Sequence, residues 1–311
     1  MTDAWYDSDR STQGDTDSLP TIVQTTSFQP QKIPLTSPSF DMALDVLPSD
    51  TLTSYPFPLG WYIDEVDDDR LSFHLACANL LTTHSIGIFG PKRYGKTTVV
   101  NTGILSLILN RSSKEIQFII IDLKNLDFMQ LKNSSYTYYY ASTITDFEKS
   151  IGLIYQEILN RIKLFEQLNI ISWKDYPEDD LPLIVIYLTD IPLLSLCIGE
   201  DTLNEWIKML ITFAPNFGFR VIIDSIYSNQ IYHQWYTLLD THILGPIPKE
   251  IHPIIYRYTT KDIPNTSIIH TKMVLDLPYS YQGLFSMIND NGQRKLIRSI
   301  YSNESLIHES D

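Results

Sequence analysis

SIGIFGPKRYGKTTVVNTGILSLIL, residues 85–109, joins a short apolar run to a helical one through a turn framed by two glycines. Within it, GPKRYGKT from Gly90 to Thr97 matches the phosphate-loop pattern G-x-x-x-x-G-K-[ST] in full. Average residue usage gives such a match by chance in roughly one chain in a hundred of this length. The context strengthens the prediction of a phosphate loop, because SIGIF predicts the strand that must precede the loop and TVVNTGILSLIL predicts the helix that must follow. The alternative is a plain glycine turn between a strand and a helix.

The residue types of this loop suit a polyphosphate ligand. Gly90 and Gly95 let the backbone wrap the phosphates with its N–H groups directed inward, and the helix N-terminus adds partial positive charge. Lys96 is expected to reach the β and γ phosphates, and the Thr97 hydroxyl to ligate Mg²⁺. ATP and Mg²⁺ are therefore the expected ligands. The predicted nucleotide-binding residues are Gly90, Pro91, Lys92, Arg93, Tyr94, Gly95, Lys96, Thr97 and Thr98.

Apolar runs and periodic segments alternate on both sides of the loop, which indicates βαβ units and a mostly parallel sheet. Further buried strands are expected at residues 116–122, 181–190 and 218–226. A long crossover helix is predicted within residues 145–170, with Thr145 and Glu148 as its capping box. A second helix, TLNEWIKMLITFAPN, is expected to stop near Pro215.

A C-terminal hairpin completes the predicted α/β fold, with GLFSMINDNGQRKLIRSI as its strands and Asn291-Gly292 in its turn. The predicted organisation is a tail at residues 1–50, one domain at 51–304 and a short tail at 305–311. The first tail is rich in Ser, Thr, Asp, Pro and Gln, so it buries too little apolar surface to order itself. The alternative is a strap that docks on a neighbouring subunit through Trp5, Tyr6, Phe28 or Phe40.

The charge of the chain bears on its partners. Its 23 Lys and Arg against 37 Asp and Glu give a net charge of −14, and no basic run longer than GPKR is present. Because such a surface repels phosphate backbones, the isolated chain is not expected to bind nucleic acid. Cys77 and Cys197 are too few and isolated for a disulfide framework or a zinc site. They are interpreted as small buried hydrophobes of a reducing compartment.

Targeting signals also bear on where the chain works. Residues 181–199 are long enough to span a membrane but carry Asp190 and Pro192, so they are interpreted as a buried strand followed by a loop. The N-terminus has neither a basic nor an apolar leader region. A cytoplasmic protein without a transmembrane segment is therefore expected, and recruitment to a membrane by a partner stays open.

Hydrolysis needs a second strand that ends in a magnesium-binding carboxylate followed by a general base. LIVIYLTD ends in Asp190, which is the predicted second Mg²⁺ ligand beside Thr97. The next residue is Ile191, which cannot accept a proton, and Glu200 lies ten residues beyond Asp190, on an expected loop. No catalytic residue is therefore assigned.

Several polar residues keep two interpretations. Lys92 and Arg93 could touch phosphate or DNA, or simply be solvated. Arg161 could reach a neighbour's nucleotide as an arginine finger, but a surface charge is the more ordinary role. Asp122 and Lys124 follow a strand at the carboxyl edge of the sheet, where open α/β sheets place their sites, and a structural salt bridge fits them as well.

These segments resemble the FtsK/SpoIIIE branch of the FtsK/HerA superfamily of P-loop ATPases. GKTTVVNTGILSLILNRSSKEIQFIIIDLKN is similar to that family's phosphate-loop helix and next strand, and LPLIVIYLTD to its Walker B strand. The resemblance spans about residues 55–302 and implies a RecA-like fold. The segment from FPLGWYIDEVDDDR to GPKRYGKTT resembles the tandem ATPase domains of type VII secretion, the EccC/EssC group, more than DNA translocases.

The departures from the family pattern concern hydrolysis. The family's Thr-Gln sensor corresponds to Ser225 and Ile226, and its arginine finger to Ala214-Pro215. With the Glu also absent, the resemblance implies ATP binding with weak or no hydrolysis, since loss of a finger alone can cost a factor of about 10³.

The resemblance also implies partners. It suggests a ring or stack with a homologous ATPase or with itself, as a regulatory or structural member of a secretion or translocation machine. The alternatives are an active hexameric DNA translocase and a nucleotide-free scaffold.

Overall fold

The structure, a computed structural model, describes residues 43, 47, 55–66, 70–125, 127–177, 180–226, 235–246, 282–289 and 294–300. All of them belong to one compact unit, Pro34–Asp311. The tail positions Trp5, Tyr6, Phe28 and Phe40, the hairpin turn Asn291-Gly292 and residues 305–311 lie outside the described residues.

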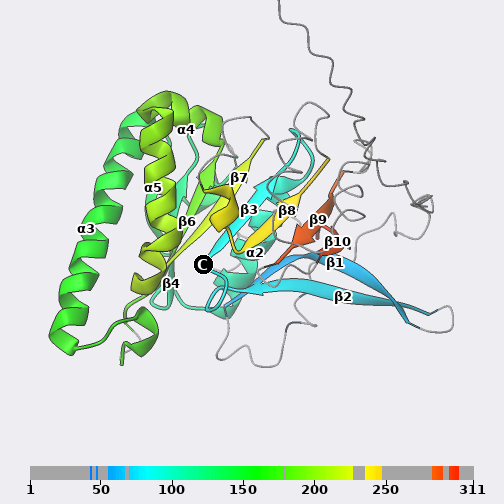
Figure 1. The fold of residues 1–311 in the computed structure, drawn as a ribbon, viewed down its shortest axis with the longest axis horizontal. Helices are drawn as coiled ribbons and strands as arrows, with labels where there is room; N and C mark the ends of the chain where they lie inside the picture. Colours follow the sequence, from blue (N-terminus) through cyan, green and yellow to red (C-terminus); the bar gives the residue numbers. More distant parts are fainter. Residues whose placement is uncertain are drawn as a thin grey trace, which may run out of the picture. The chain divides into compact units, whose positions relative to one another are not determined.

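The described strands form one ten-stranded sheet (Figure 1). Its strands are β1 (Pro56–Val66), β2 (Arg70–Asn79), β3 (Ser85–Phe89), β4 (Ile116–Ile121), β5 (Thr137–Ala141), β6 (Leu183–Thr189), β7 (Phe219–Ser225), β8 (Thr241–Leu244), β9 (Leu284–Ile288) and β10 (Arg294–Arg298). Its α-helices are α2 (Lys96–Asn110), α3 (Ile144–Leu168), α4 (Ile191–Ile198) and α5 (Glu200–Thr212). A short 3₁₀ helix, η4 (Ala214–Phe217), precedes β7.

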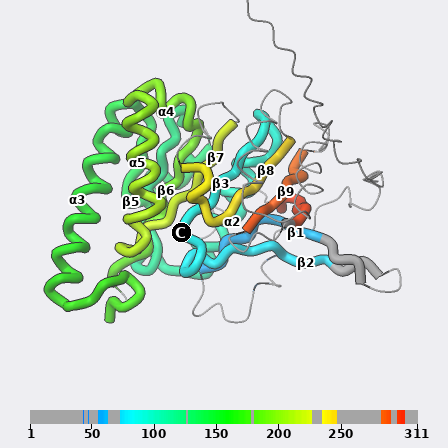
Figure 2. Tube along the Cα trace, viewed as in Figure 1, coloured from blue at the N-terminus to red at the C-terminus, as the bar shows by residue number. Residues whose placement is uncertain are grey.

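The strand order is β2-β1-β10-β9-β8-β3-β7-β6-β4-β5. The six strands from β8 to β5 run parallel, and β8, β9, β10, β1 and β2 pair antiparallel. This confirms the predicted mostly parallel α/β sheet and the C-terminal hairpin, β9–β10. The aromatic run at residues 136–140 lies largely in β5, at the edge of the sheet beside α3 (Figure 2).

The two faces of the sheet are covered by different helices. Along β6, Ile184, Ile186 and Leu188 pack in the cluster that contains α3, α4 and α5, whereas Val185 and Tyr187 pack in the cluster that contains α2 and β1. This is the period of two of a strand with both faces buried. Helix α2, which follows the phosphate loop, therefore packs on the face of the sheet that carries Val185 and Tyr187. Residues of β1 belong to the same cluster.

Three local predictions were wrong in detail. Helix α3 begins at Ile144 and its N-cap is Thr143, whose side chain accepts a hydrogen bond from the Asp146 N–H at 3.1 Å, so Thr145 lies inside the helix. Residues 191–198 form a helix, α4, instead of a loop, because Pro192 lies in the first turn, where its missing N–H costs nothing. Glu200 begins α5 instead of lying on a loop.

Cys77 and Cys197 are half-buried free thiols, each less buried than the predicted core role implies. Among the described residues, no helix is long and apolar enough to cross a membrane.

Helix α2 is seated against β1 by a glycine. A Cβ added at Gly103 would lie 2.2 Å from two carbons of the Phe57 ring. We expect Gly103→Ala to destabilise the protein by about 1–3 kcal/mol, because the ring must move and overpacking costs more than the helix propensity gained. Urea unfolding measures this change in the free energy of unfolding.

Gly152 in α3 is the matched control, because a Cβ added there meets no atom within 4 Å. Gly152→Ala is expected to stabilise the protein by about 0.5–1 kcal/mol through helix propensity alone. Equal stabilisation by both alanines would contradict the close contact between α2 and β1.

Candidate functional site

The loop between β3 and α2 is a tight turn at the carboxyl end of the parallel strands. Gly95 has φ +96° and Arg93 has φ +60°, so two of its residues lie in the left-handed region that favours glycine. The Gly90 N–H donates to the Ser225 carbonyl at 3.3 Å, and the Gly245 N–H donates to the Phe89 carbonyl at 2.7 Å. Both neighbouring strands, β7 and β8, therefore hold the start of the loop.

Lys96 folds back into the curve of the loop. Its side chain is 10% exposed, and its Nζ donates to the Pro91 carbonyl at 3.0 Å. The same Nζ lies 3.8 Å from Asp224 Oδ1. The ammonium group is thus enclosed by the loop that is expected to hold phosphates.

Asp224 of β7 is the carboxylate beside the loop, and the sequence analysis missed it. It is buried, and its Oδ2 accepts hydrogen bonds from the Thr97 hydroxyl at 3.1 Å and from the Tyr187 hydroxyl at 3.2 Å. Burial raises the pKa of Asp224, although the Lys96 charge and the two hydroxyl groups act against that rise. The available signal was an Asp that directly follows the apolar residues VII in the predicted strand GFRVIIDSI.

Asp190, the predicted Mg²⁺ ligand, has a different partner. It follows the last residue of β6, has φ +52°, and its Oδ2 lies 2.5 Å from Lys124 Nζ. Its N–H donates to the Asp224 carbonyl at 2.9 Å. The structure thus brings the two aspartates to neighbouring strand ends, with Asp224 at the Thr97 hydroxyl and Asp190 at Lys124.

The Asp122 carboxylate accepts hydrogen bonds from the turn that follows β4 and from β5. The donors are the Lys124 N–H at 3.2 Å, the Asp127 N–H at 3.0 Å and the Tyr140 hydroxyl at 3.3 Å. Of the two interpretations left open for Asp122 and Lys124, the salt bridge between them was wrong about the partner, because the Lys124 ammonium pairs with Asp190. Asp122 shapes the turn that presents Lys124.

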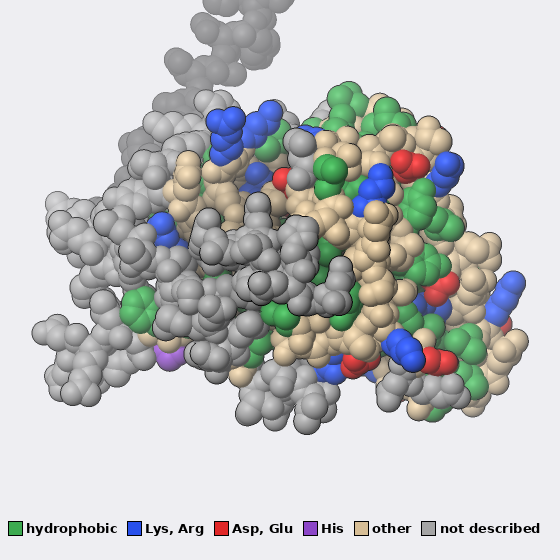
Figure 3. Space-filling view, turned by 180° about the vertical axis from the view of Figure 1, so that it is seen from behind, with side chains coloured by type: hydrophobic (Ala, Val, Ile, Leu, Met, Phe, Trp, Pro, Cys, Tyr) green, Lys and Arg blue, Asp and Glu red, His purple; other side chains and the backbone are tan. Residues whose placement is uncertain are grey.

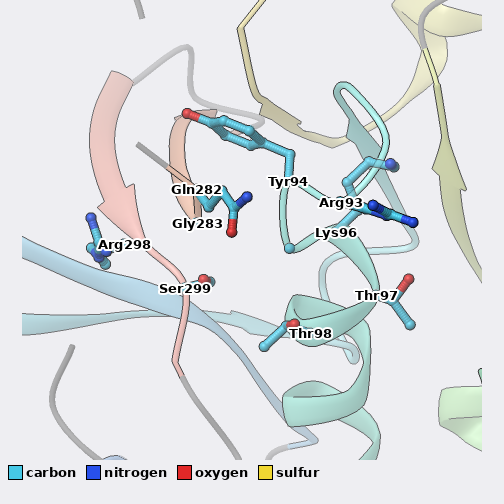
Figure 4. A pocket seen from close by; sticks show the side chains of 10 residues that line it. Arg93, Tyr94, Lys96, Thr97, Thr98, Gln282, Gly283, Arg298 and Ser299 are labelled. Carbon is cyan, nitrogen blue, oxygen red and sulfur yellow. The ribbon is translucent and has the colours of Figure 1, made fainter. Parts of the chain in front are cut away.

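A cavity of about 420 Å³ adjoins the start of α2 (Figure 4). The loop and α2 line one side of it and the C-terminal hairpin region the other, from Gln282 and Gly283 to Arg298 and Ser299. In Figure 4, Thr98 faces the side of Ser299, whereas Thr97 points to the opposite side of the helix start. The hairpin residues were missed because they lie far from the loop in sequence and carry no motif.

One hydrogen bond joins the loop to the hairpin side of this cavity, and another lies within the hairpin side. The Gly283 N–H donates to the Tyr94 carbonyl at 2.9 Å, and the Ser299 N–H donates to the Gly283 carbonyl at 2.8 Å. Tyr94 is buried, with its ring edge-on to Phe285 at 5.4 Å. The loop residue Tyr94 therefore anchors the hairpin, while the neighbouring Lys92 and Arg93 are exposed.

The structure describes the positions that the family resemblance associates with hydrolysis. Ile191 is buried at the start of α4, and Ser225 ends β7 with its hydroxyl buried and without a hydrogen-bond partner among the described residues. Ala214 and Pro215 lie in η4. Glu200 is exposed on α5.

Arg161 is buried, so the expectation of a surface charge was wrong. Its side chain is 1% exposed, and its guanidinium donates to the Phe217 carbonyl at 2.8 Å and the Pro182 carbonyl at 2.9 Å. Its Nε donates to Glu157 at 2.9 Å. Because Pro182 precedes β6, Arg161 lies at the amino end of that strand, whereas the loop lies at the carboxyl end of the sheet.

No cluster of three or more His, Cys, Asp or Glu side chains suited to a metal occurs in the described part of the chain. A phosphate-loop magnesium site needs no such cluster, because one hydroxyl and one carboxylate complete a shell made mostly of phosphate oxygens and water. The Thr97 hydroxyl and the buried carboxylate beside it fit that donor set.

Part of this chain is similar to a known protein family. Residues 72–216 match the model of the FtsK/SpoIIIE family. The DNA translocase FtsK of Clostridium tetani is 26% identical over 147 residues, which are 44% of this chain and 19% of that protein. The match thus spans about a fifth of that relative's length.

Solved structures share the fold at low identity. Thermomonospora curvata EccC, ATPases 2 and 3 in complex with a signal sequence peptide, has a TM-score of 0.60 and 14% identity, over 88% of this chain and 44% of that chain. The pCW3 conjugation coupling protein TcpA, a monomer form with ATPγS, has a TM-score of 0.62 and 14% identity, over 90% and 73%. The fold is therefore that of an α/β P-loop ATPase.

Proposed function

We propose, from the premise that residues 72–216 carry an FtsK/SpoIIIE-type ATPase domain, that this chain binds Mg·ATP in the loop from Gly90 to Thr97. The observation that carries the proposal is the enclosure of Lys96 within an intact phosphate loop, 3.8 Å from a buried carboxylate. The remaining predicted residues, Pro91, Lys92, Arg93, Tyr94, Gly95 and Thr98, are proposed to contribute backbone groups to the site. Of these, Arg93, Tyr94, Gly95 and Thr98 also line the adjoining cavity.

Each group of the site has a proposed task. Backbone N–H groups and the positive end of α2 attract the phosphates, and Lys96 neutralises their outer charge. Thr97 and an aspartate at the strand ends, where Asp190 and Asp224 are the candidates, hold Mg²⁺. The bound cation supplies electrostatic stabilisation of the β and γ phosphates. The cavity at Arg298 and Ser299 offers the adjoining volume for the nucleoside.

We propose that hydrolysis is weak or absent. Ile191 offers no general base, Ile226 no sensor amide, and Ala214-Pro215 no finger. Since a finger alone is worth about 10³ or more in rate, the missing groups favour a nucleotide that is held rather than consumed.

The proposed biological role is a regulatory or structural ATPase member of a secretion or translocation machine, assembled with itself or with a homologous ATPase. The likeness to EccC and TcpA supports this class of machine. The chain is expected to work in the cytoplasm, with membrane recruitment supplied by a partner.

An active DNA translocase is the second candidate, and the match to FtsK supports it. The net charge of −14 weighs against it, although Figure 3 shows a few described Lys and Arg side chains close together at the upper edge of one face. A net charge of that sign offers little electrostatic attraction to DNA.

Thermal unfolding with and without nucleotide tests the proposed function. A ligand at a hundred times its dissociation constant stabilises the folded state by about 2.7 kcal/mol, so Mg·ATP is expected to raise Tm by several degrees. AMP, which lacks the β and γ phosphates, is the control and should leave Tm nearly unchanged. An unchanged Tm with Mg·ATP would support the nucleotide-free scaffold instead.

A further inference from the structure

We propose that Asp224 on β7, and not Asp190 after β6, is the carboxylate that this chain presents to Mg²⁺. The inference rests on the proposed binding of Mg·ATP. It means that the metal-facing carboxylate has moved across the sheet by one strand, from the strand where the sequence pattern placed it.

The first argument for Asp224 comes from its contacts at the first turn of α2. Asp224 Oδ2 accepts from the Thr97 hydroxyl at 3.1 Å, and Asp224 Oδ1 lies 3.8 Å from Lys96 Nζ. One buried carboxylate thus meets both loop side chains that are expected to act on Mg²⁺ and phosphate. Tyr187 donates to the same Oδ2 at 3.2 Å and fixes its orientation from the neighbouring strand.

The second argument comes from the register of the sheet, which shows which side chain of β6 lies beside Asp224. In β7, Asp224 pairs with Ile88 of the loop strand β3 on one side and with Thr189 of β6 on the other. Paired residues of neighbouring parallel strands share a face of the sheet, and Tyr187, two residues before Thr189, packs in the cluster on the α2 face. At the end of β6, therefore, the side chain that accompanies Asp224 is a neutral threonine.

The third argument comes from the conformation and the partners of Asp190. It lies one residue beyond Thr189, in a left-handed conformation that a non-glycine residue seldom adopts. Its carboxylate lies 2.5 Å from the Lys124 ammonium, and its N–H is bound to the Asp224 carbonyl at 2.9 Å. Asp190 therefore already has a cation, and its backbone is tied to the strand that carries Asp224.

The charge balance explains why Asp224 would need a metal. In the structure its nearby cation is Lys96, which is also the residue expected to neutralise the phosphates. A buried carboxylate that shares its cation with a polyphosphate repels that polyphosphate unless another positive charge is present. Wild-type protein is therefore expected to bind ATP at least about tenfold more weakly in EDTA than with Mg²⁺.

The test compares ATP affinity in Mg²⁺ and in EDTA for three proteins, by calorimetry. Asp224→Asn should bind ATP in EDTA at least as tightly as wild type, and Mg²⁺ should improve its affinity by less than about threefold. Asp190→Asn should retain the wild-type metal dependence. The spectrum of Mn²⁺ with ATP and protein gives a second readout, in which tight Mn²⁺ is lost in Asp224→Asn alone.

A rescue variant tests the move between strands directly. Asp224→Asn combined with Thr189→Asp returns a carboxylate to β6, in register with position 224, and should restore the metal dependence. Circular dichroism checks the fold of each variant, and Asp224→Ser removes the same charge if the asparagine variant does not fold.

The possible results distinguish a failure of the Asp224 inference from a failure of the proposed ATP binding. Metal dependence that survives in Asp224→Asn and is lost in Asp190→Asn overturns this inference while leaving ATP binding intact. If wild type binds no ATP in either buffer, the proposed function fails, and this inference fails with it.

Discussion

Lys96→Ala is expected to weaken ATP binding roughly 100-fold. The ammonium is enclosed by the loop, within 3.0 Å of the Pro91 carbonyl, so it needs little movement to meet a phosphate. Hydrogen bonds to charged groups contribute about 1.5–3 kcal/mol, and 2.7 kcal/mol corresponds to about 100-fold in the dissociation constant. The substitution also leaves Asp224 facing the phosphates without its cation, which adds repulsion. Calorimetric titration with Mg·ATP measures the loss.

Lys114→Ala is the matched control, because it removes one exposed lysine just beyond the opposite end of α2. Its ATP affinity should lie within about twofold of wild type, since exposed charges at that distance are largely screened. An equal loss in both variants would show that net charge, and not the loop, governs binding.

The second large effect concerns stability. Arg161→Met is expected to destabilise the protein by about 3–5 kcal/mol, because it leaves Glu157 without its buried partner and two backbone carbonyls without their donors. Methionine keeps much of the aliphatic volume, so the loss reports on the polar contacts. Urea unfolding gives the free energy change.

Lys163→Met on the exposed side of α3 is the control, with an expected change within about 0.5 kcal/mol. ATP affinity should be unchanged in Arg161→Met protein that is folded, since Arg161 lies at the amino end of β6. A variant as stable as wild type that loses ATP binding would favour a finger role for Arg161 instead.

The regular part of the fold was predictable because its signals are local. The central strands β3, β4, β6 and β7 are rich in apolar residues, as strands between two helical layers must be, and the loop follows β3 directly. The hairpin was likewise predictable from Asn291-Gly292, which lies between the segments that form β9 and β10. Helix ends were harder, because Thr143 and Thr145 are both acceptable caps, and only the structure shows that Thr143 is used.

The site was only half visible from the sequence. The loop is continuous in the chain, so its motif suffices to find Lys96 and Thr97. Which strand provides the carboxylate beside Thr97 depends on the register across β3, β7 and β6, and the sequence does not show that Lys124 lies beside Asp190. Arg161 was misread for the same reason, since its partners lie on segments distant in sequence.

The most direct measurement is single-turnover hydrolysis of labelled ATP by wild type and Lys96→Ala, with the bound fraction recorded in the same samples and double-stranded DNA present or absent. The account predicts that wild type holds Mg·ATP, that Lys96→Ala does not, and that wild-type turnover stays well below about 1 per second with or without DNA. Turnover of about 1 per second or faster in wild type, lost in Lys96→Ala, would contradict it and identify an active motor.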